Sequence, residues 1–274
     1  MATTLTSTTD GYILGRTSAE YQRLHIQALK WEPITLRVLL QAGLKPGMHC
    51  LDAGCGTGDV MRLMGSIVTK AGSVTGFDID KNIGEEALSI LNSLDNSNYS
   101  FENTDITTTN PERCKYDFVF ARFLLVHMTD PRAIIKKLFS TVKDGGTLLI
   151  QDYDFSSIKA GKKLQHITDY VRQVNNAAFS RTGKDPETGT NLAAYFAETI
   201  GDPDGTDAAS IITPFKEGAS MMKAVLKALT PILLKLNITT EDRLNQCFDD
   251  LDTGSEEKNM FLLWPMMNGA WKRK

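Results

Sequence analysis

The stretch Leu51-Asp-Ala-Gly-Cys-Gly-Thr-Gly-Asp-Val60 determines how the rest of the chain is interpreted, because it follows a short apolar run and opens an amphipathic one. Its glycines, Gly54, Gly56 and Gly58, occupy alternate positions. Glycine adopts backbone conformations that are closed to residues with side chains, and it lets N–H groups come close to a bound molecule. The stretch therefore predicts a strand–loop–helix site for a nucleotide-like ligand.

The position of the third glycine distinguishes between two kinds of nucleotide site. The dinucleotide fingerprint requires a glycine three residues after the second one, and Asp59 occupies that position. The pattern Asp52-x-Gly54-x-Gly56-x-Gly58 instead resembles motif I of the class I S-adenosylmethionine (SAM)-dependent methyltransferases. Within that family, the chain resembles the small-molecule enzymes of the ubiquinone/menaquinone methyltransferase type.

Strand-like and helix-like segments alternate around this turn. The expected strands are 48–53, 73–78, 99–103, 116–121 and 147–151, and the expected helices between them are 59–68, 83–94 and 131–142. Such alternation implies parallel βαβ units, in which ligands bind at the carboxyl ends of the strands. With the family resemblance, this predicts an α/β, Rossmann-like, doubly wound fold with a mostly parallel seven-stranded sheet.

The N-terminal part is expected to form two helices before the sheet. Thr17-Ser-Ala-Glu20 has the pattern of a capping box, and Pro33 allows a second helix to start before the stop at Gly43. The resemblance implies that these helices fold over the cofactor and that Tyr12 and Tyr21 contact the acceptor. An aromatic stripe packed on the sheet is the alternative interpretation.

The order of segments loosens after residue 154. Helices are expected at 164–179, 191–200, 221–236 and 240–251, and strands at 208–213 and 258–267, the last one ending at Asn268-Gly269 on the edge of the sheet. The helices expected at 221–236 and 240–251 are interpreted as a cap. We expect one structural domain composed of residues 1–44 (leader and lid helices), 45–154 (SAM-binding core) and 155–274 (rest of the sheet with the cap insertion).

Composition excludes several classes of partner. The 274 residues contain 30 basic and 33 acidic side chains, with a net charge of −3, so neither nucleic acid nor a membrane is an expected partner. The four cysteines lack metal-ligand spacing, and no bound metal is expected. No run of apolar residues predicts a membrane span or a signal peptide, which favours a cytoplasmic protein. The oligomeric state is left open between monomer and homodimer.

The resemblance assigns most cofactor contacts to the ends of the first three strands. It places Gly54 and Gly56 beside the methionine part and Asp52 near its ammonium group, and it includes Gly58 among the cofactor contacts. Taken separately, Asp52 could instead be an ordinary loop carboxylate.

The ribose and adenine contacts follow farther along the chain. Asp78, followed by Ile79, closes the second strand and matches the acid that accepts the ribose hydroxyls, whereas Asp80 is expected to cap the next helix or to be solvated. Asp105 and Ile106 match the adenine site, the carboxylate for the exocyclic amine and the backbone N–H for a ring nitrogen. A loop carboxylate at Asp78 and a helix cap at Asp105 are the structural alternatives.

The segment after the fourth strand, 117–131, resembles the family region that passes the methionine end and leads toward the acceptor. Ala121 and Arg122 are therefore assigned to the cofactor, and Arg122 with Phe123 to the acceptor. Arg122 can alternatively pair with a neighbouring carboxylate. Lys143-Asp-Gly-Gly146 resembles the family's turn before the fifth strand, with aspartate in place of proline.

Catalytic candidates lie at the ends of the fourth and fifth strands. Methyl transfer is an in-line displacement, so positioning the acceptor provides much of the catalysis, and a base helps where the acceptor is a hydroxyl or ammonium. His127 and Asp154 are the candidate bases, although a histidine at this point recurs in the family without acting as one. Trp264 is a candidate for the acceptor pocket, with core packing as its alternative.

These matches occur in the order that the family requires. The resemblance implies methyl transfer from SAM to an oxygen or nitrogen of a small, largely apolar metabolite, with S-adenosylhomocysteine (SAH) as the product. The alternatives are a C-methyltransferase, a cyclase or isomerase that uses the sulfonium only for its charge, a non-catalytic binding protein, and a methyltransferase for protein or RNA.

Overall fold

The structure, a computed structural model, describes residues 14, 17–94 and 97–274. A seven-stranded sheet has the strand order β3-β2-β1-β4-β5-β10-β7. The first five strands are parallel, and β10 is antiparallel to both β5 and β7. Their bounds are β1 (His49–Ala53), β2 (Ser73–Asp78), β3 (Asn98–Asn103), β4 (Tyr116–Arg122), β5 (Val142–Asp154), β7 (Gly205–Ala209) and β10 (Met266–Arg273).

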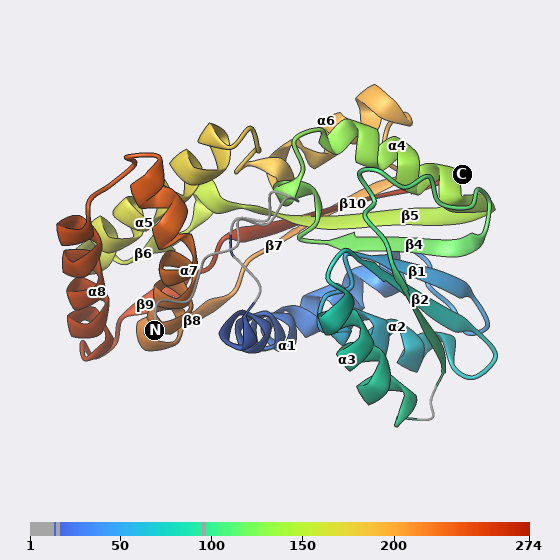
Figure 1. Cartoon of the computed structure of the whole chain (residues 1–274), viewed down its shortest axis with the longest axis horizontal. Helices are drawn as coiled ribbons and strands as arrows, with labels where there is room; N and C mark the ends of the chain where they lie inside the picture. Colours follow the sequence, from blue (N-terminus) through green and yellow to red (C-terminus); the bar gives the residue numbers. More distant parts are fainter. Residues whose placement is uncertain (1–13, 15–16, 95–96) are drawn as a thin grey trace.

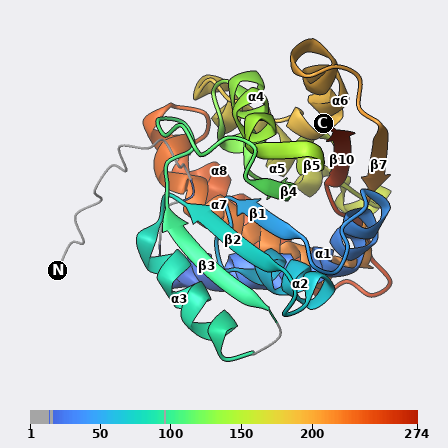
Figure 2. The same ribbon diagram turned by 90° about the vertical axis from the view of Figure 1, so that its right-hand side faces the viewer.

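Helices cover both faces of this sheet (Figure 2). On one face, α1 (Ser18–Gln41), α2 (Asp59–Val68) and α3 (Lys81–Asn92) bury apolar side chains against the strands. On the other face, α4 (Pro131–Thr141) and α6 (Thr188–Thr199) do the same. The strand order reverses direction between β1 and β4, which is where such sheets bind ligands. The predicted doubly wound, mostly parallel seven-stranded fold is confirmed.

The first half of the chain matches the predicted elements, with one exception in the N-terminal part. Instead of two helices, the single helix α1 runs from Ser18 to Gln41 and contains Pro33. Trp31 on one side of the proline and Val38 on the other are fully buried. Proline has no N–H, so one backbone hydrogen bond of the helix is missing. Packing holds both halves of the helix in line, and the helix continues despite this loss.

The C-terminal strands differ more from the prediction. The segment 208–213 forms parts of β7 and β8 (Ile212–Pro214), and 258–267 forms β9 (Phe261–Leu263) and the start of β10. Pro265, which has no N–H to donate, separates β9 from β10. Strand β10 does not end at Asn268-Gly269 or lie at the edge, because pairing with β5 and β7 carries the strand through these turn-forming residues.

Several other boundaries differ from the prediction, among them the start of α7 at Phe215 instead of residue 221. Strand β5 already begins at Val142, so the expected turn at 143–146 lies within the strand as an irregularity in its pairing with β4. Helix α6 begins at Thr188 instead of the expected residue 191. Strand β5 also runs on to Asp154, beyond its predicted end at residue 151.

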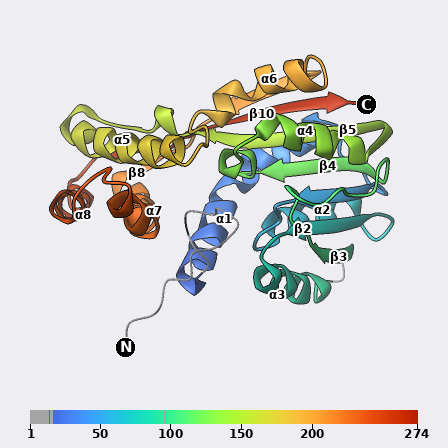
Figure 3. The same ribbon diagram turned by 45° about the horizontal axis from the view of Figure 1, so that its top comes forward.

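A second lobe lies beyond the carboxyl ends of β4 and β5 (Figures 1 and 3). It contains the three-stranded sheet β6-β9-β8, with β6 at Lys159–Ala160, and the helices α5 (Gln165–Arg181), α7 (Phe215–Lys235) and α8 (Glu241–Ser255). These elements share a large apolar core with Trp31 of α1. The lobe and α1 therefore enclose the edge of the sheet at which the ligand site is expected.

Two features are absent from the described residues. None of their helices combines the length and apolarity needed to cross a membrane. Among the same residues, no group of three or more histidines, cysteines and carboxylates is arranged to hold a metal ion.

Candidate cofactor and acceptor site

The glycine turn joins β1 to α2 through left-handed backbone. The φ angles are +74° at Gly54, +48° at Gly56 and +75° at Gly58, a region that disfavours residues with side chains. The N–H groups of Gly54 and Cys55 donate to the carbonyl of Phe77 at 2.8 and 2.9 Å, which fixes the turn to β2. The sequence pattern therefore corresponds to a real conformational requirement.

The three glycines have different surroundings. A Cβ at Gly58 would lie 2.9 Å from Cβ of Ala87, and one at Gly54 would lie 3.1 Å from Cδ1 of Leu124. A Cβ at Gly56 would meet no protein atom within 4 Å. Packing thus explains two of the glycines, whereas Gly56 borders open space that a ligand can occupy.

Asp78 ends β2 beside the glycine turn. Its Oδ2 accepts a hydrogen bond from the N–H of Gly56 at 2.9 Å, and its Oδ1 accepts from the N–H of Asp80 at 2.9 Å. The neighbouring Asp80 caps α3 through the N–H of Asn82, which is the first of the two roles expected from the sequence. The fold therefore places the Asp78 carboxylate at the turn and gives Asp80 a separate, structural task.

Asp52 is buried at the end of β1. It is 2% exposed, and its Oδ2 has no hydrogen-bond partner among the described residues. Burial raises the pKa of Asp52 to about 7, the Arg122 guanidinium counteracts this increase, and Asp78 and Asp59 add to it. A buried, incompletely bonded carboxyl group is costly, which favours a cationic or hydrogen-bonding ligand here.

The predicted cofactor contacts continue after β2 with Ile79 and after β3 with Asp105 and Ile106, the latter two predicted for the adenine. Ile79 is 39% exposed, an unusual position for a large apolar side chain. The Asp105 carboxylate accepts hydrogen bonds from the Thr107 N–H at 2.8 Å and its hydroxyl at 2.6 Å. Slight burial raises the pKa of Asp105, but hydrogen bonds from Thr107 and Thr108 outweigh it, so the net pKa is lowered. The adjacent Ile106 is nearly buried.

Helix α1 bridges the two sides of the site. The Tyr21 hydroxyl donates to Asp80 at 2.5 Å, and Nδ1 of His25 lies 2.9 Å from a carboxylate oxygen of Asp59. Farther along the helix, the Thr35 hydroxyl accepts a hydrogen bond from Arg122. Tyr12 lies outside the described residues, so its predicted role stays a prediction.

Arg122 and Ala121 end β4 on opposite faces of the sheet. Ala121 is fully buried, whereas the Arg122 guanidinium points toward α1, with Nη1 2.9 Å from the Thr35 hydroxyl. Burial lowers the pKa of Arg122, and the nearby Asp52 and Tyr153 counteract this decrease. The next residue, Phe123, has a φ of +56°, a strained value that a bulky residue rarely adopts.

Aromatic rings from four segments meet beside Arg122. Phe123 stacks on Tyr153 with the ring centroids 4.0 Å apart, and Tyr153 continues to Phe155 at 5.3 Å. Phe155 lies 5.0 Å from Phe179 of α5, and the indole of Trp31 donates to the Tyr153 hydroxyl. We call this set the aromatic row: Trp31, Phe123, Tyr153, Phe155 and Phe179.

His127 lies at the end of the aromatic row. Its ring is 5.8 Å from Phe179. Burial, together with the positive charges of Lys184 and Arg23, lowers the pKa of His127 to about 3. The imidazole is therefore neutral at physiological pH and is a weak base.

The other candidates, Asp154 and Trp264, make structural contacts. The Asp154 carboxylate accepts from the N–H of Ser156 at 2.8 Å and from the Thr190 hydroxyl at 2.9 Å. The Trp264 indole is 3% exposed and donates to the Thr213 hydroxyl at 2.9 Å. The Asp154 contacts are those of a carboxylate that caps the turn after β5, and the burial of Trp264 matches core packing, its alternative interpretation. Their catalytic and acceptor-binding roles stay predictions.

Two polar residues on β5 escaped the sequence interpretation. Gln151 is fully buried, and neither polar atom of its side chain has a partner among the described residues. Asp152 is also fully buried and accepts a hydrogen bond from the N–H of Val126 at 3.1 Å, which holds the segment before His127. The sequence signal that could have identified them is their position, because both polar residues directly follow the apolar run 148–150 of a buried strand.

Comparisons with known proteins agree with this geometry. A family model described as a methyltransferase domain matches residues 19–193, more than half of the chain. Phosphoethanolamine N-methyltransferase 1 of Arabidopsis thaliana is 30% identical over 148 residues, 50% of this chain and 30% of that protein. Ubiquinone biosynthesis O-methyltransferase of Coxiella burnetii is 31% identical over 118 residues, 42% of this chain and 48% of that protein. The matched region spans less than half of each relative.

Solved structures share the fold. Phosphoethanolamine N-methyltransferase 2 of Haemonchus contortus, in complex with phosphomonomethylethanolamine and SAH, has a TM-score of 0.57 at 17% identity, covering 98% of this chain and 61% of that chain. Such low identity supports the architecture alone. The family model, the strand order and the glycine turn after β1 show that the chain belongs to the methyltransferase-domain family, within the class I SAM-dependent methyltransferases.

Proposed function

We propose that this protein transfers the methyl group of SAM to an oxygen or nitrogen atom of a small, largely apolar metabolite. The aromatic row is the observation that supports this acceptor class. It lies where β4 and β5 end, between α1 and the second lobe. Phe123, one of its rings, directly follows Arg122 at the end of β4. Its partly buried rings, Phe123 and Phe155, would give the acceptor a flat, apolar wall, while Trp31, Tyr153 and Phe179 are buried behind them as support.

The residues at the other end of the site suit SAM. When bound, SAM supplies an electrophilic methyl group on its sulfonium. Asp52, with an unbonded Oδ2, would hold the ammonium of the methionine part, and Asp78 the ribose hydroxyls. The open space at Gly56 allows close approach to its backbone. The exposed Ile79 would pack on the adenine.

The described residues support catalysis by positioning. His127 is neutral and weakly basic, and the Asp154 carboxylate is engaged by two hydrogen bonds. The His127 imidazole is thus a weak base, and existing hydrogen bonds already occupy the Asp154 carboxylate. The aromatic row would hold the acceptor atom in line with the sulfonium, and this suits an acceptor that is nucleophilic without strong base catalysis, such as an amine or an ionisable phenol.

The test couples binding to product analysis. Calorimetry with SAH measures cofactor affinity, and mass spectrometry detects SAH and methylated products from a panel of apolar phenols and amines. The variant Phe155→Leu should raise the acceptor KM while leaving the affinity for SAH unchanged, because it removes one ring of the aromatic row. Phe139→Leu, which changes a ring on α4 away from this site, is the matched control.

The outcomes separate the alternatives. Failure of the protein to bind SAH would contradict the proposal. Conversion of an acceptor without release of SAH would instead support a cyclase or isomerase. A product methylated on carbon would support the C-methyltransferase alternative.

A further inference from the structure

The three-stranded sheet of the second lobe has two unlike faces. Its inner face carries Ala160, Leu262 and Thr213, which are 6%, 1% and 7% exposed. Leu262 packs on α7, where a side chain on Gly218 would clash with it. The inner face is therefore part of the apolar core of the lobe.

The outer face is apolar and open. Because side chains alternate along strands, it carries the residues next to those of the inner face. The pairing register places Lys159 and Ile212 on either side of Leu263, and Pro214 opposite Phe261. Ile212 is 68% exposed and Phe261 is 53% exposed. Large side chains that are this exposed together indicate an interaction surface.

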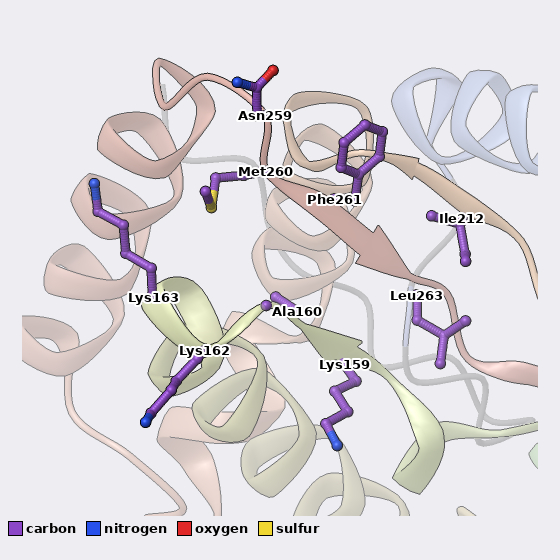
Figure 4. Close-up of a pocket in the computed structure, with 10 residues that line it drawn as sticks. Lys159, Ala160, Lys162, Lys163, Ile212, Asn259, Met260, Phe261 and Leu263 are labelled. Atoms are coloured by element: carbon purple, nitrogen blue, oxygen red, sulfur yellow. The ribbon is translucent and has the colours of Figure 1, made fainter.

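Lysines border this face. A shallow hollow of about 430 Å³ lies against it, and Figure 4 shows Lys159, Lys162 and Lys163 around the hollow with Phe261, Ile212 and Leu263. None of the residues that line the hollow is acidic. Lys163 pairs with Glu257 at 2.7 Å, whereas Lys159 and Lys162 have no ion-pair partner among the described residues. The hollow thus combines an apolar surface with uncompensated positive charge.

We propose that the outer face of this small sheet docks on the surface of an anionic lipid bilayer. Phe261 and Ile212 would enter the boundary between headgroups and acyl chains, and Lys159 and Lys162 would lie against the anionic headgroups. Exposed apolar side chains beside lysines suit such a surface, because burial and charge attraction act together. A nucleic acid would use the lysines but would leave the apolar side chains exposed.

This inference departs from the expectation drawn from the net charge of −3. A whole-chain average does not describe one face, and charge attraction falls off within about 8 Å at physiological salt. The potential at the docking surface is therefore set by its own charges, which are Lys159 and Lys162, unpaired among the described residues, and the Lys163–Glu257 pair, rather than by carboxylates farther away. The proposal is independent of methyl transfer, because it uses none of the residues of the cofactor and acceptor site.

The experiment is co-sedimentation of the full chain with vesicles of phosphatidylcholine, with and without 30 mol% phosphatidylserine. The expected result is binding to the anionic vesicles that weakens as salt rises. The double variant Lys159→Ala/Lys162→Ala should lose about 30-fold in partitioning, since each lysine near the surface contributes about 1 kcal/mol. Phe261→Ser should lower vesicle partitioning by about tenfold or more, because it removes the ring that the bilayer would bury.

Matched controls use similar residues elsewhere. Ile90 on α3 is 58% exposed, and Lys136 lies on the exposed side of α4, so Ile90→Ser and Lys136→Ala should leave partitioning unchanged. Thermal melting verifies that each variant is folded. The proposal is overturned if the wild-type protein ignores anionic vesicles, if neutral vesicles bind it equally, or if the controls lose as much as the test variants. A change of oligomeric state in Phe261→Ser, without loss of vesicle binding, would assign the face to a second copy of the chain instead.

Discussion

The cofactor side and the acceptor side of the site are built in different ways. On the cofactor side, the main features are backbone turns and one carboxylate at the end of each strand, within short segments such as 52–58 and 78–80. On the acceptor side, Trp31, Tyr153 and Phe179 come from segments far apart in the chain and meet only in the folded protein. A short sequence can specify the first kind of site, whereas the second kind depends on how helices and strands pack.

The difference has a consequence for substitutions. Changes on the cofactor side should act through backbone geometry and charge, with large effects on the affinity for SAM and SAH. Changes on the acceptor side should act through packing and be distributed over several side chains, because no single group there carries the chemistry. Substitutions can test this contrast, from the largest expected effect to the smallest.

The largest effect is expected for Gly56→Ala. A Cβ at this position meets no protein atom within 4 Å, so it would occupy the space assigned to the cofactor. A forced contact of this kind costs up to about 3 kcal/mol, or roughly 100-fold in SAH affinity by calorimetry. Gly43→Ala is the matched control, because Gly43 has a φ of +96° and also has open space around it. Both variants should lose about 1 kcal/mol of stability through backbone strain. Equal SAH affinity in the two variants would contradict the cofactor assignment.

The second effect concerns the two carboxylates after β2. Asp78→Asn removes a charged acceptor for the ribose hydroxyls, and a loss of about 30-fold in SAH affinity is expected, in line with hydrogen bonds to charged groups. Asp80→Asn should change the affinity much less, because that carboxylate caps α3 and costs about 1 kcal/mol of stability at most. If Asp80→Asn lost more SAH affinity than Asp78→Asn, the ribose contact would have to be assigned to Asp80 instead of Asp78.

These two predictions use residues that can be identified in the amino-acid sequence alone. The glycine turn and Asp78 were predictable because left-handed backbone and strand ends have local sequence signatures. The fold class was predictable for the same reason, since alternating strands and helices imply parallel units. The helix cap at Asp80 was one of the two roles predicted for that residue, and the structure selects it.

The acceptor side was less predictable. The sequence interpretation assigned no acceptor role to Tyr153, Phe155 or Phe179, because the row that they form depends on where α5 packs relative to β5. The order of the last strands was wrong for a similar reason. Turn-forming Asn268-Gly269 lies inside β10, where pairing on both sides outweighs local propensity.

The third prediction concerns pH and Asp52. Burial raises the pKa of Asp52 to about 7 in the free protein, while an ammonium ligand favours the ionised carboxylate. SAH affinity should therefore increase as pH rises toward 7, by about tenfold between pH 6 and pH 7.5, and then level off. Calorimetry across this range measures the trend, and Asp52→Asn should show a flat profile. A wild-type profile that is equally flat would contradict the ammonium contact.

The same group predicts how stability depends on pH. The folded pKa of Asp52 lies above the unfolded value, so the unfolded chain releases the proton first as pH rises. The free protein should therefore lose stability between about pH 4 and pH 7, by up to about 4 kcal/mol from this group alone. Urea unfolding of wild type and Asp52→Asn should diverge over this window, with the variant gaining relative stability at higher pH.

The smallest effect is expected on the acceptor side, for His127→Asn. With a pKa of about 3, due to burial and to the charges of Lys184 and Arg23, His127 stays neutral between pH 5 and pH 9. Its loss should change kcat less than about tenfold, below the usual contribution of a general base. The pH–rate profiles of the wild type and of His127→Asn should have the same shape near pH 6.5, without an inflection that is specific to the wild type. An inflection that disappears in His127→Asn would show that ligand binding shifts this imidazole into the physiological range, and the acceptor side would then contain a base that chemical catalysis depends on.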